Sequence, residues 1–192
     1  MRPIISAQLI RTILAGYAQP PDGTHGVSHW ARVLENGLRL AHQTGAKIVV
    51  VQLFAVFHDA RRINEGIDPG HGRRGADYAA SQRGVLFDLP GEDFELLYTA
   101  CTYHTDGLTE GDVTVQTCWD ADRLDLGRVG IAPHPRHLCT EAAQDAQLIQ
   151  WANQRSRQRL VPDIVTAEWT VLDPPAPSIT AGSACPGGQS RE

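Results

Sequence analysis

Apolar residues in the first part of the chain recur at the spacing of an α-helix. Side chains three or four positions apart gather on one face of a helix. The first segment has such residues at Ile4, Ile5, Leu9, Ile10, Ile13 and Leu14. After the helix-breaking residues 19–23, the next segment has them at Val27, Trp30, Val33, Leu34, Gly37, Leu38 and Ala41. We therefore predict amphipathic helices over residues 4–14 and 26–41.

Residues 48–57 form an apolar run in which only Gln52 is polar. Periodicity cannot separate a buried strand from a buried helix in so short a run, and its β-branched residues would suit a strand. However, the neighbouring segments all have helical patterns, and the run lacks the turn residues typical of paired strands. We therefore favour a buried helix over a strand.

Glycine and proline mark the boundaries of the remaining elements. Residues 64–70 are predicted to form a loop. Further helices are predicted over residues 72–86, 91–104, 109–124 and 138–159. Thr109 and Asp112 resemble a capping box at the start of the third of these helices, with Asp in place of the usual Glu.

Length and composition are those of an ordinary globular protein. The 192 residues are 42% hydrophobic and 20% charged, which is enough for one domain with its own core. Beyond Asp173 the chain is rich in Pro, Ser, Gly and Thr and cannot bury enough apolar surface to offset its ordering entropy. We therefore predict a single helical domain over residues 1–172 and a disordered tail over residues 173–192.

Charge and cysteine spacing exclude several classes of protein. The net charge of −5 argues against a protein that coats nucleic acid, and no basic stripe with interleaved aromatic residues is present. The four cysteines form no C-x-x-C pair, which favours reduced thiols over a zinc ribbon or a disulfide scaffold. No segment approaches the ~20 apolar residues of a membrane helix, and Gln8 and Arg11 interrupt the apolar start of the chain. We expect a cytoplasmic protein without membrane contact.

The candidate chemistry centres on the pair His58-Asp59, at the end of the apolar run. A neutral imidazole and a carboxylate are good ligands for divalent cations. A charged Asp beside an apolar helix also needs a partner, which a metal would supply. His25 and His29 lie upstream, about one helical turn apart. Taken singly, each of these residues has a structural alternative, such as helix capping or pairing with a nearby arginine.

The order of His29, His58-Asp59 and Asp122 resembles the H…HD…D motif of the HD-domain metal-dependent phosphohydrolases. The resemblance covers residues 25–130, and the similar segments are residues 29–33, 54–59 and 120–125. It implies an all-α, HD-domain-like helical bundle with a central metal site. It also implies that His29, His58, Asp59 and Asp122 hold one divalent cation.

The resemblance also bears on the neighbouring candidates. Asp122 is preferred to Asp120 as the last ligand, because the family's ligand typically precedes Arg-Leu, as Asp122 does here. The two side chains would point about 200° apart on a helix. His71 and His104 fall where dinuclear branches of the family place further ligands, so the number of ions stays open. Alternatively, His71 would contact a substrate phosphate and His104 would cap a helix. His25 is an additional candidate ligand.

Arginines and carboxylates near these ligands are candidates for substrate binding and catalysis. Arginine binds phosphate oxygens through bidentate contacts, and the candidates are Arg32, Arg62, Arg74 and Arg123. Some of them would simply lie on the surface. A carboxylate could orient the attacking water, and besides Asp59 itself the candidates are Glu65 and Asp120.

The resemblance implies a phosphomonoesterase or phosphodiesterase that acts on a small phosphorylated metabolite, with a nucleotide as the favoured case. Its cofactor would be Mn, Fe, Co, Ni, Mg or Zn, as one ion or two. The alternatives are a di-iron HD-fold oxygenase and a non-catalytic, metal-stabilised helical ligand-binding module. The sequence leaves the oligomeric state open.

Overall fold

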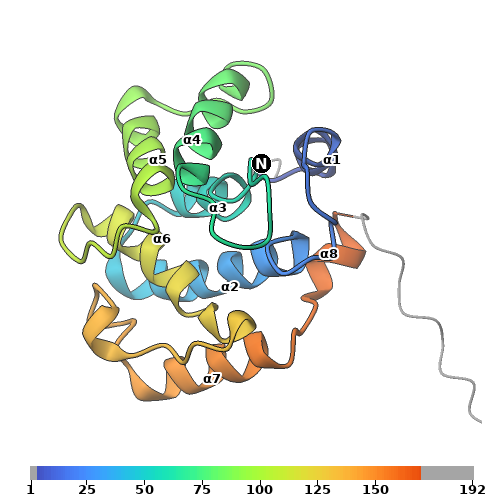
Figure 1. Cartoon of the computed structure of the whole chain (residues 1–192). Helices are drawn as coiled ribbons and strands as arrows, with labels where there is room; N and C mark the ends of the chain where they lie inside the picture. Colours follow the sequence, from blue (N-terminus) through green and yellow to red (C-terminus); the bar gives the residue numbers. More distant parts are fainter. Residues whose placement is uncertain (1–3, 170–192) are drawn as a thin grey trace, which may run out of the picture.

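A computed structural model of the chain describes residues 4–169, which fold into eight α-helices and two short 3-10 helices without a strand (Figure 1). The all-α class predicted from the sequence is confirmed. None of the helices in this range has the length and apolar composition needed to span a bilayer. The predicted disordered tail over residues 173–192 lies outside the described residues.

The elements follow one another along the chain with short connections. The α-helices are α1 (Ala7–Ala15), α2 (Val27–Thr44), α3 (Ile48–Phe57), α4 (His71–Gln82), α5 (Gly91–Tyr103), α6 (Val113–Arg123), α7 (Ala146–Arg157) and α8 (Asp163–Ala167). The 3-10 helices are η1 (Leu126–Val129) and η2 (Pro135–His137).

Helix α3 is the centre of the fold (Figure 1). It contacts α2, α4, α5 and α6, and every residue from Leu53 to Phe57 is fully buried. A helix that is apolar on all sides has no face to present to water, so it is stable only when other helices surround it. The predicted buried helix over residues 48–57 is therefore confirmed, and its last turn delivers His58-Asp59 into the interior.

Helix α2 is the longest helix and packs against both α3 and α6. It continues to Thr44, beyond the predicted end at residue 41, because Gly45 ends it in a left-handed conformation with φ of 73°. Gly37 faces α3 so closely that a Cβ there would lie 2.4 Å from Val51 Cγ1. This close packing fixes the start of α2 beside the end of α3.

Side-chain caps explain two differences at helix starts. Helix α1 begins at Ala7 because the Ser6 hydroxyl accepts a hydrogen bond from Leu9 N at 3.1 Å. Helix α6 begins at Val113 because the Asp112 carboxylate accepts one from Thr114 N at 2.7 Å. Asp112 is thus the N-cap itself, and the predicted helix start at Thr109 is wrong.

The predicted helix over residues 138–159 is also wrong in its first part. The backbone N–H groups of Cys139 and Thr140 donate to the buried Asp120 carboxylate at 2.7 and 2.9 Å, which holds this segment in an irregular conformation. The helix α7 begins only after Asp145, whose carboxylate accepts from Leu148 N. A long-range polar contact therefore overrides the local helical pattern.

Candidate metal centre

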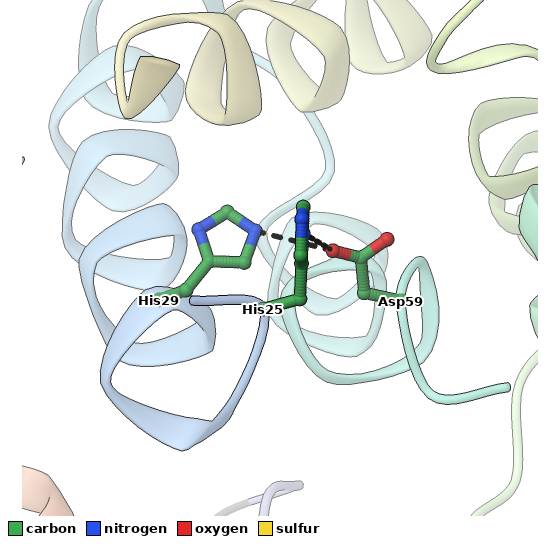
Figure 2. A group of neighbouring side chains, drawn as sticks. All are labelled: His25, His29 and Asp59. Atoms are coloured by element: carbon green, nitrogen blue, oxygen red, sulfur yellow. Dashed lines mark hydrogen bonds and ion pairs between the residues drawn. The ribbon is translucent and has the colours of Figure 1, made fainter. Parts of the chain in front are cut away.

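The centre forms where the start of α2, the end of α3 and the end of α6 meet. Figure 2 shows His25 and His29, from the start of α2, pointing toward the carboxylate of Asp59, which follows α3. His58 is the C-cap of α3, and Asp122 lies in the last turn of α6. All five residues are less than one-tenth exposed. Residues up to 97 positions apart thus share one buried polar site.

Four atoms of this site have the spacing of ligands around one cation. His29 Nε2 and His58 Nε2 are 3.0 Å apart, and Asp59 Oδ2 lies 3.6 Å from each of them. Asp122 Oδ1 lies 3.5 Å from His29 Nε2 and 3.9 Å from His58 Nε2. Donor atoms ~2.1 Å from a shared cation are about 3.0 Å apart in an octahedron and about 3.4 Å apart in a tetrahedron. The four predicted ligands therefore fit a divalent ion.

The other oxygen of Asp59 faces a second group of ligand atoms. His71 begins α4 and His104 is the C-cap of α5. Asp59 Oδ1 lies 3.1 Å from His71 Nε2 and 3.7 Å from His104 Nε2, and these two nitrogens are 2.9 Å apart. The single carboxylate of Asp59 thus lies between two pairs of imidazoles.

Hydrogen bonds orient all four of these imidazoles in the same way. Each Nδ1 lies within hydrogen-bond distance of an acceptor oxygen, so each Nδ1–H donates and each Nε2 keeps its lone pair. The acceptors are Asp125 Oδ2 for His29 (2.7 Å), Phe54 O for His58 (3.1 Å), Asp68 O for His71 (2.6 Å) and Cys101 O for His104 (2.8 Å). Neutral Nε2 atoms that face one another have no proton to share, and a cation between them would remove the repulsion of their lone pairs.

The charges of the buried groups suit metal binding at neutral pH. Burial lowers the pKa of His58 to about 3, so this imidazole is neutral. Burial alone would raise the pKa of Asp59, but the adjacent His58 and hydrogen bonds from His104 and His25 hold it well below its usual range. Burial would likewise raise the pKa of Asp122, which Arg128 and His58 keep low. The carboxylates are therefore ionised and the imidazole of His58 is unprotonated, as metal ligands must be.

Asp125 supports His29 from behind and was not among the predicted site residues. It is 1% exposed, and both its oxygens also accept hydrogen bonds from Arg32, at 2.7 Å from Nε and 3.0 Å from Nη2. Arg32 Nη1 donates to Leu160 O. The guanidinium that was predicted to bind substrate therefore holds Asp125, which in turn fixes the ring of His29. The sequence signal for Asp125 was its place in the acidic segment after Trp119.

Asp125→Asn is expected to lower the affinity for a divalent ion by about 10–100-fold, the usual effect of losing a carboxylate behind a ligating histidine. The amide can donate to Nδ1 and so favour the tautomer of His29 that carries its proton on Nε2. Competition with a metal-binding dye would measure the affinity. Asp163→Asn, on the exposed start of α8, is the matched control. Equal affinities in the two variants would remove the supporting role of Asp125.

Three other predicted residues have partners away from the ligand atoms. The Asp120 carboxylate is buried and accepts from Cys139 N, Thr140 N and the Thr140 hydroxyl, so it shapes the chain before α7. Arg74 donates twice to Asp68, and Arg123 donates to the carbonyl oxygens of residues 137 and 108. These contacts give no support to a catalytic role for Asp120 or a substrate role for the two arginines.

Three predicted residues do lie beside the ligand atoms. Arg62 Nη1 is 3.4 Å from Asp59 Oδ1, while its Nη2 donates to Gly66 O at 2.6 Å. His25 Nδ1 is 2.9 Å from Asp59 Oδ2, and its Nε2 is 4.0 Å from Glu65 Oε2. The Glu65 side chain is 35% exposed, so it lies between the centre and solvent.

Arg128 is a further charged residue at the centre and was not predicted. Its Nη2 lies 3.4 Å from Asp122 Oδ1, and its Nη1 donates to Asp125 O at 3.0 Å. It comes from η1, which begins directly after Asp125. Because residues 126–129 had no predicted element, the sequence offered no way to place this side chain.

Comparison with known proteins adds one likeness in fold. No known family model and no curated protein matches the chain. Among solved structures, the chain is similar to a predicted HD superfamily hydrolase from an uncultured Thermotogales bacterium, with a TM-score of 0.59 and 25% sequence identity. The likeness covers 79% of this chain and 86% of that chain.

The fold and the centre together define the class of protein. The chain has the helical fold of the HD superfamily, and its clustered histidines and aspartates fit a metal site. The resemblance that the sequence showed to the HD-domain proteins is thereby confirmed.

Proposed function

We propose that the protein is a metal-dependent phosphohydrolase that cleaves a phosphate ester of a nucleotide or another small phosphorylated metabolite. The observation that carries this proposal is the convergence of four unprotonated Nε2 atoms on the two oxygens of Asp59. The likeness to a predicted HD superfamily hydrolase supports a general hydrolase role.

In this proposal His29, His58, Asp59 and Asp122 hold one divalent ion. Asp59, through its other oxygen, would hold a second ion together with His71 and His104. A divalent cation in such a site lowers the pKa of water and withdraws charge from a phosphoryl oxygen. The oxygen and nitrogen donors suit Mn, Fe, Co, Ni, Mg or Zn.

The surrounding side chains would bind the ester and move a proton. Arg62 Nη1, beside Asp59 Oδ1, can donate to a phosphate oxygen. His25 donates its Nδ1–H to Asp59, so its Nε2 can accept a proton from the attacking water. Glu65, 4.0 Å from that nitrogen, would stabilise the resulting imidazolium and exchange the proton with solvent. Glu65 thus keeps the catalytic role expected from the sequence, with His25 between it and the ligands.

The test is reconstitution of metal-free protein with each of the six metals, followed by measurement of released phosphate. The substrate panel would contain nucleoside phosphates, sugar phosphates and a phosphodiester. At least one metal is expected to support turnover, and a chelator is expected to abolish it. Tight nucleotide binding without phosphate release under any metal would instead identify a non-catalytic binding module.

A di-iron oxygenase is the second candidate, because Asp59 faces a pair of imidazoles with each oxygen. Such a carboxylate is placed to bridge two ions. Iron content and oxygen uptake with candidate organic substrates would separate the two functions. Iron-dependent oxygen consumption coupled to substrate cleavage, without phosphate release from an ester, would favour the oxygenase.

The double variant His71→Ala/His104→Ala is expected to lower the number of bound ions from two to one per chain. It removes both nitrogens that face Asp59 Oδ1 and leaves the four atoms of the first group in place. Metal content after reconstitution and gel filtration would measure this number. If wild type and variant each hold one ion, the proposed second site is absent.

A further inference from the structure

A small polar cavity of about 120 Å³ lies next to the metal centre. Arg32, Arg128 and Arg159 line it, and Asp22 is the one carboxylate among its lining residues. Two of these arginines also touch the centre, since Arg128 contacts Asp122 and Arg32 contacts Asp125. Pockets that enclose a whole drug-sized ligand measure roughly 300–1,000 Å³. The cavity therefore suits a single functional group of a ligand that also reaches the centre.

Arg128 has hydrogen-bonding capacity that the described part of the chain does not use. Its side chain is 6% exposed, and its Nε is buried without a hydrogen-bond partner among residues 4–169. A buried guanidinium N–H without an acceptor is unfavourable, because the group has lost its water and gained nothing in return. An oxyanion in the adjoining cavity would supply the acceptor.

Arg159 has a backbone conformation that its residue type disfavours. It follows Gln158, the C-cap of α7, and has a φ of 50°, the one positive φ of a non-glycine residue within the described chain. Arg159 N donates to Ser156 O and Leu160 N donates to Arg155 O, each at 3.0 Å. These bonds form a Schellman motif, in which glycine is the preferred residue at the position of Arg159. An arginine at this position implies a use for its side chain, which lines the cavity.

The start of α2 adds to the positive character of the cavity. Ser28, in the first turn of this 18-residue helix, lines the cavity, and the N-cap Gly26 provides no side-chain hydrogen bond. The positive end of the helix dipole and the exposed N–H groups of a first turn favour an anion. Three guanidinium groups, one carboxylate and a helix start therefore surround the cavity.

We propose that this cavity binds a compact oxyanion, a second phosphate or a carboxylate, on the substrate of the metal centre. Arg128 and Arg159 would hold it, so the substrate carries two anionic groups: the ester phosphate at the metal and this one beside it. The link to a substrate rests on the proposed phosphohydrolase function, whereas anion binding in the cavity does not.

The deciding experiment is titration of metal-free protein with inorganic phosphate and with acetate, followed by calorimetry. Arg159→Gly is expected to weaken binding of the preferred anion about tenfold, the effect of one charge-assisted hydrogen bond. The same variant is expected to unfold at an equal or higher temperature, because glycine adopts the left-handed conformation without strain. Arg159→Lys should retain part of the affinity, since it keeps the charge but loses the bidentate group.

The controls locate the anion and separate binding from folding. Arg11→Ala, on the exposed side of α1, removes the same charge at a distance and should leave anion affinity unchanged. Equal affinity of Arg159→Gly and wild type, or no measurable binding of either anion to wild type at millimolar concentration, would overturn the proposal. A preference for phosphate over acetate, or the reverse, identifies the second group.

Activity measurements then test the link to substrate. Aryl phosphates that differ only by an added carboxylate or second phosphate would be compared by their ratio of kcat/KM. Wild type is expected to prefer the doubly anionic ester about tenfold, and Arg159→Gly should reduce that ratio toward one. Hydrolysis without any preference contradicts this inference and leaves the phosphohydrolase intact. Anion binding without hydrolysis contradicts the phosphohydrolase and leaves the anion site intact.

Discussion

Asp59→Asn is expected to abolish stable binding of a divalent ion and to lower phosphate release by more than about 100-fold, the upper end of what loss of a supporting partner costs a metal site. Both oxygens of Asp59 face imidazole nitrogens, Oδ2 toward His29 and His58 and Oδ1 toward His71 and His104. An amide has only one oxygen, so one pair of imidazoles loses its carboxylate partner in either orientation.

The same substitution should leave the fold intact, which makes the result interpretable. The amide N–H groups can donate to the Nε2 lone pairs that face this position, so the metal-free variant gains hydrogen bonds in place of the charge. Metal content after reconstitution, phosphate release and circular dichroism would be measured together. Asp77→Asn, on the exposed side of α4, is the control, since Asp77 pairs with Arg73 far from any ligand atom. A folded Asp59→Asn variant with wild-type metal content would contradict the proposed centre.

The ligand atoms were predictable because their signal is local and chemically distinctive. His58-Asp59 ends an apolar run, and a charged residue in that position needs a partner. The choice of His29 and Asp122 depended on the family resemblance, since nothing in the spacing of 29 and 93 residues... selects them. Helix α3 could be assigned because its flanking segments had helical periods, although its own composition suited a strand equally well.

The partners of the arginines could not be predicted, because they depend on contacts between distant segments. Arg32 and Asp125 are separated by 93 positions, yet their side chains form a buried bidentate pair. Arg74 donates to Asp68 across a loop whose path the sequence did not define. A guanidinium near a ligand in sequence therefore says little about whether its N–H groups remain available for substrate.

The irregular segment before α7 shows a similar limit at the level of secondary structure. Residues 138–145 have helical composition, but the buried Asp120 carboxylate takes the backbone N–H groups of Cys139 and Thr140. Burial raises the pKa of Asp120, and these hydrogen bonds oppose that rise. The carboxylate read as a catalytic candidate is therefore better explained as the group that shapes this turn.

Gly75→Ala is expected to destabilise the protein by about 2 kcal/mol, the middle of the range for overpacking a well-filled interior. A Cβ at Gly75 would lie 2.3 Å from Phe57 O and 2.9 Å from His58 O. These are backbone atoms at the end of α3, so they cannot move aside as a flexible side chain would. The steric effect should exceed the ~1 kcal/mol that alanine gains over glycine inside a helix.

The unfolding temperature should accordingly fall by roughly 4–8 °C, as expected for a domain of this size. Gly91→Ala is the matched control: Gly91 begins α5, and its Cβ would meet nothing within 4 Å. That variant should unfold at the wild-type temperature or slightly above it. Unchanged thermal stability of Gly75→Ala would show that α4 can shift without loss.

The same substitution links packing to the metal centre. Gly75 lies one turn after His71 on α4, so moving this helix away from α3 would lengthen the 3.1 Å approach of His71 Nε2 to Asp59 Oδ1. The four atoms of the first group come from α2, α3 and α6 and do not depend on α4. Gly75→Ala should therefore weaken the second ion more than the first, and metal titration followed by mass spectrometry would resolve the two losses. Equal weakening of both ions would mean that α4 supports the whole centre rather than one side of it.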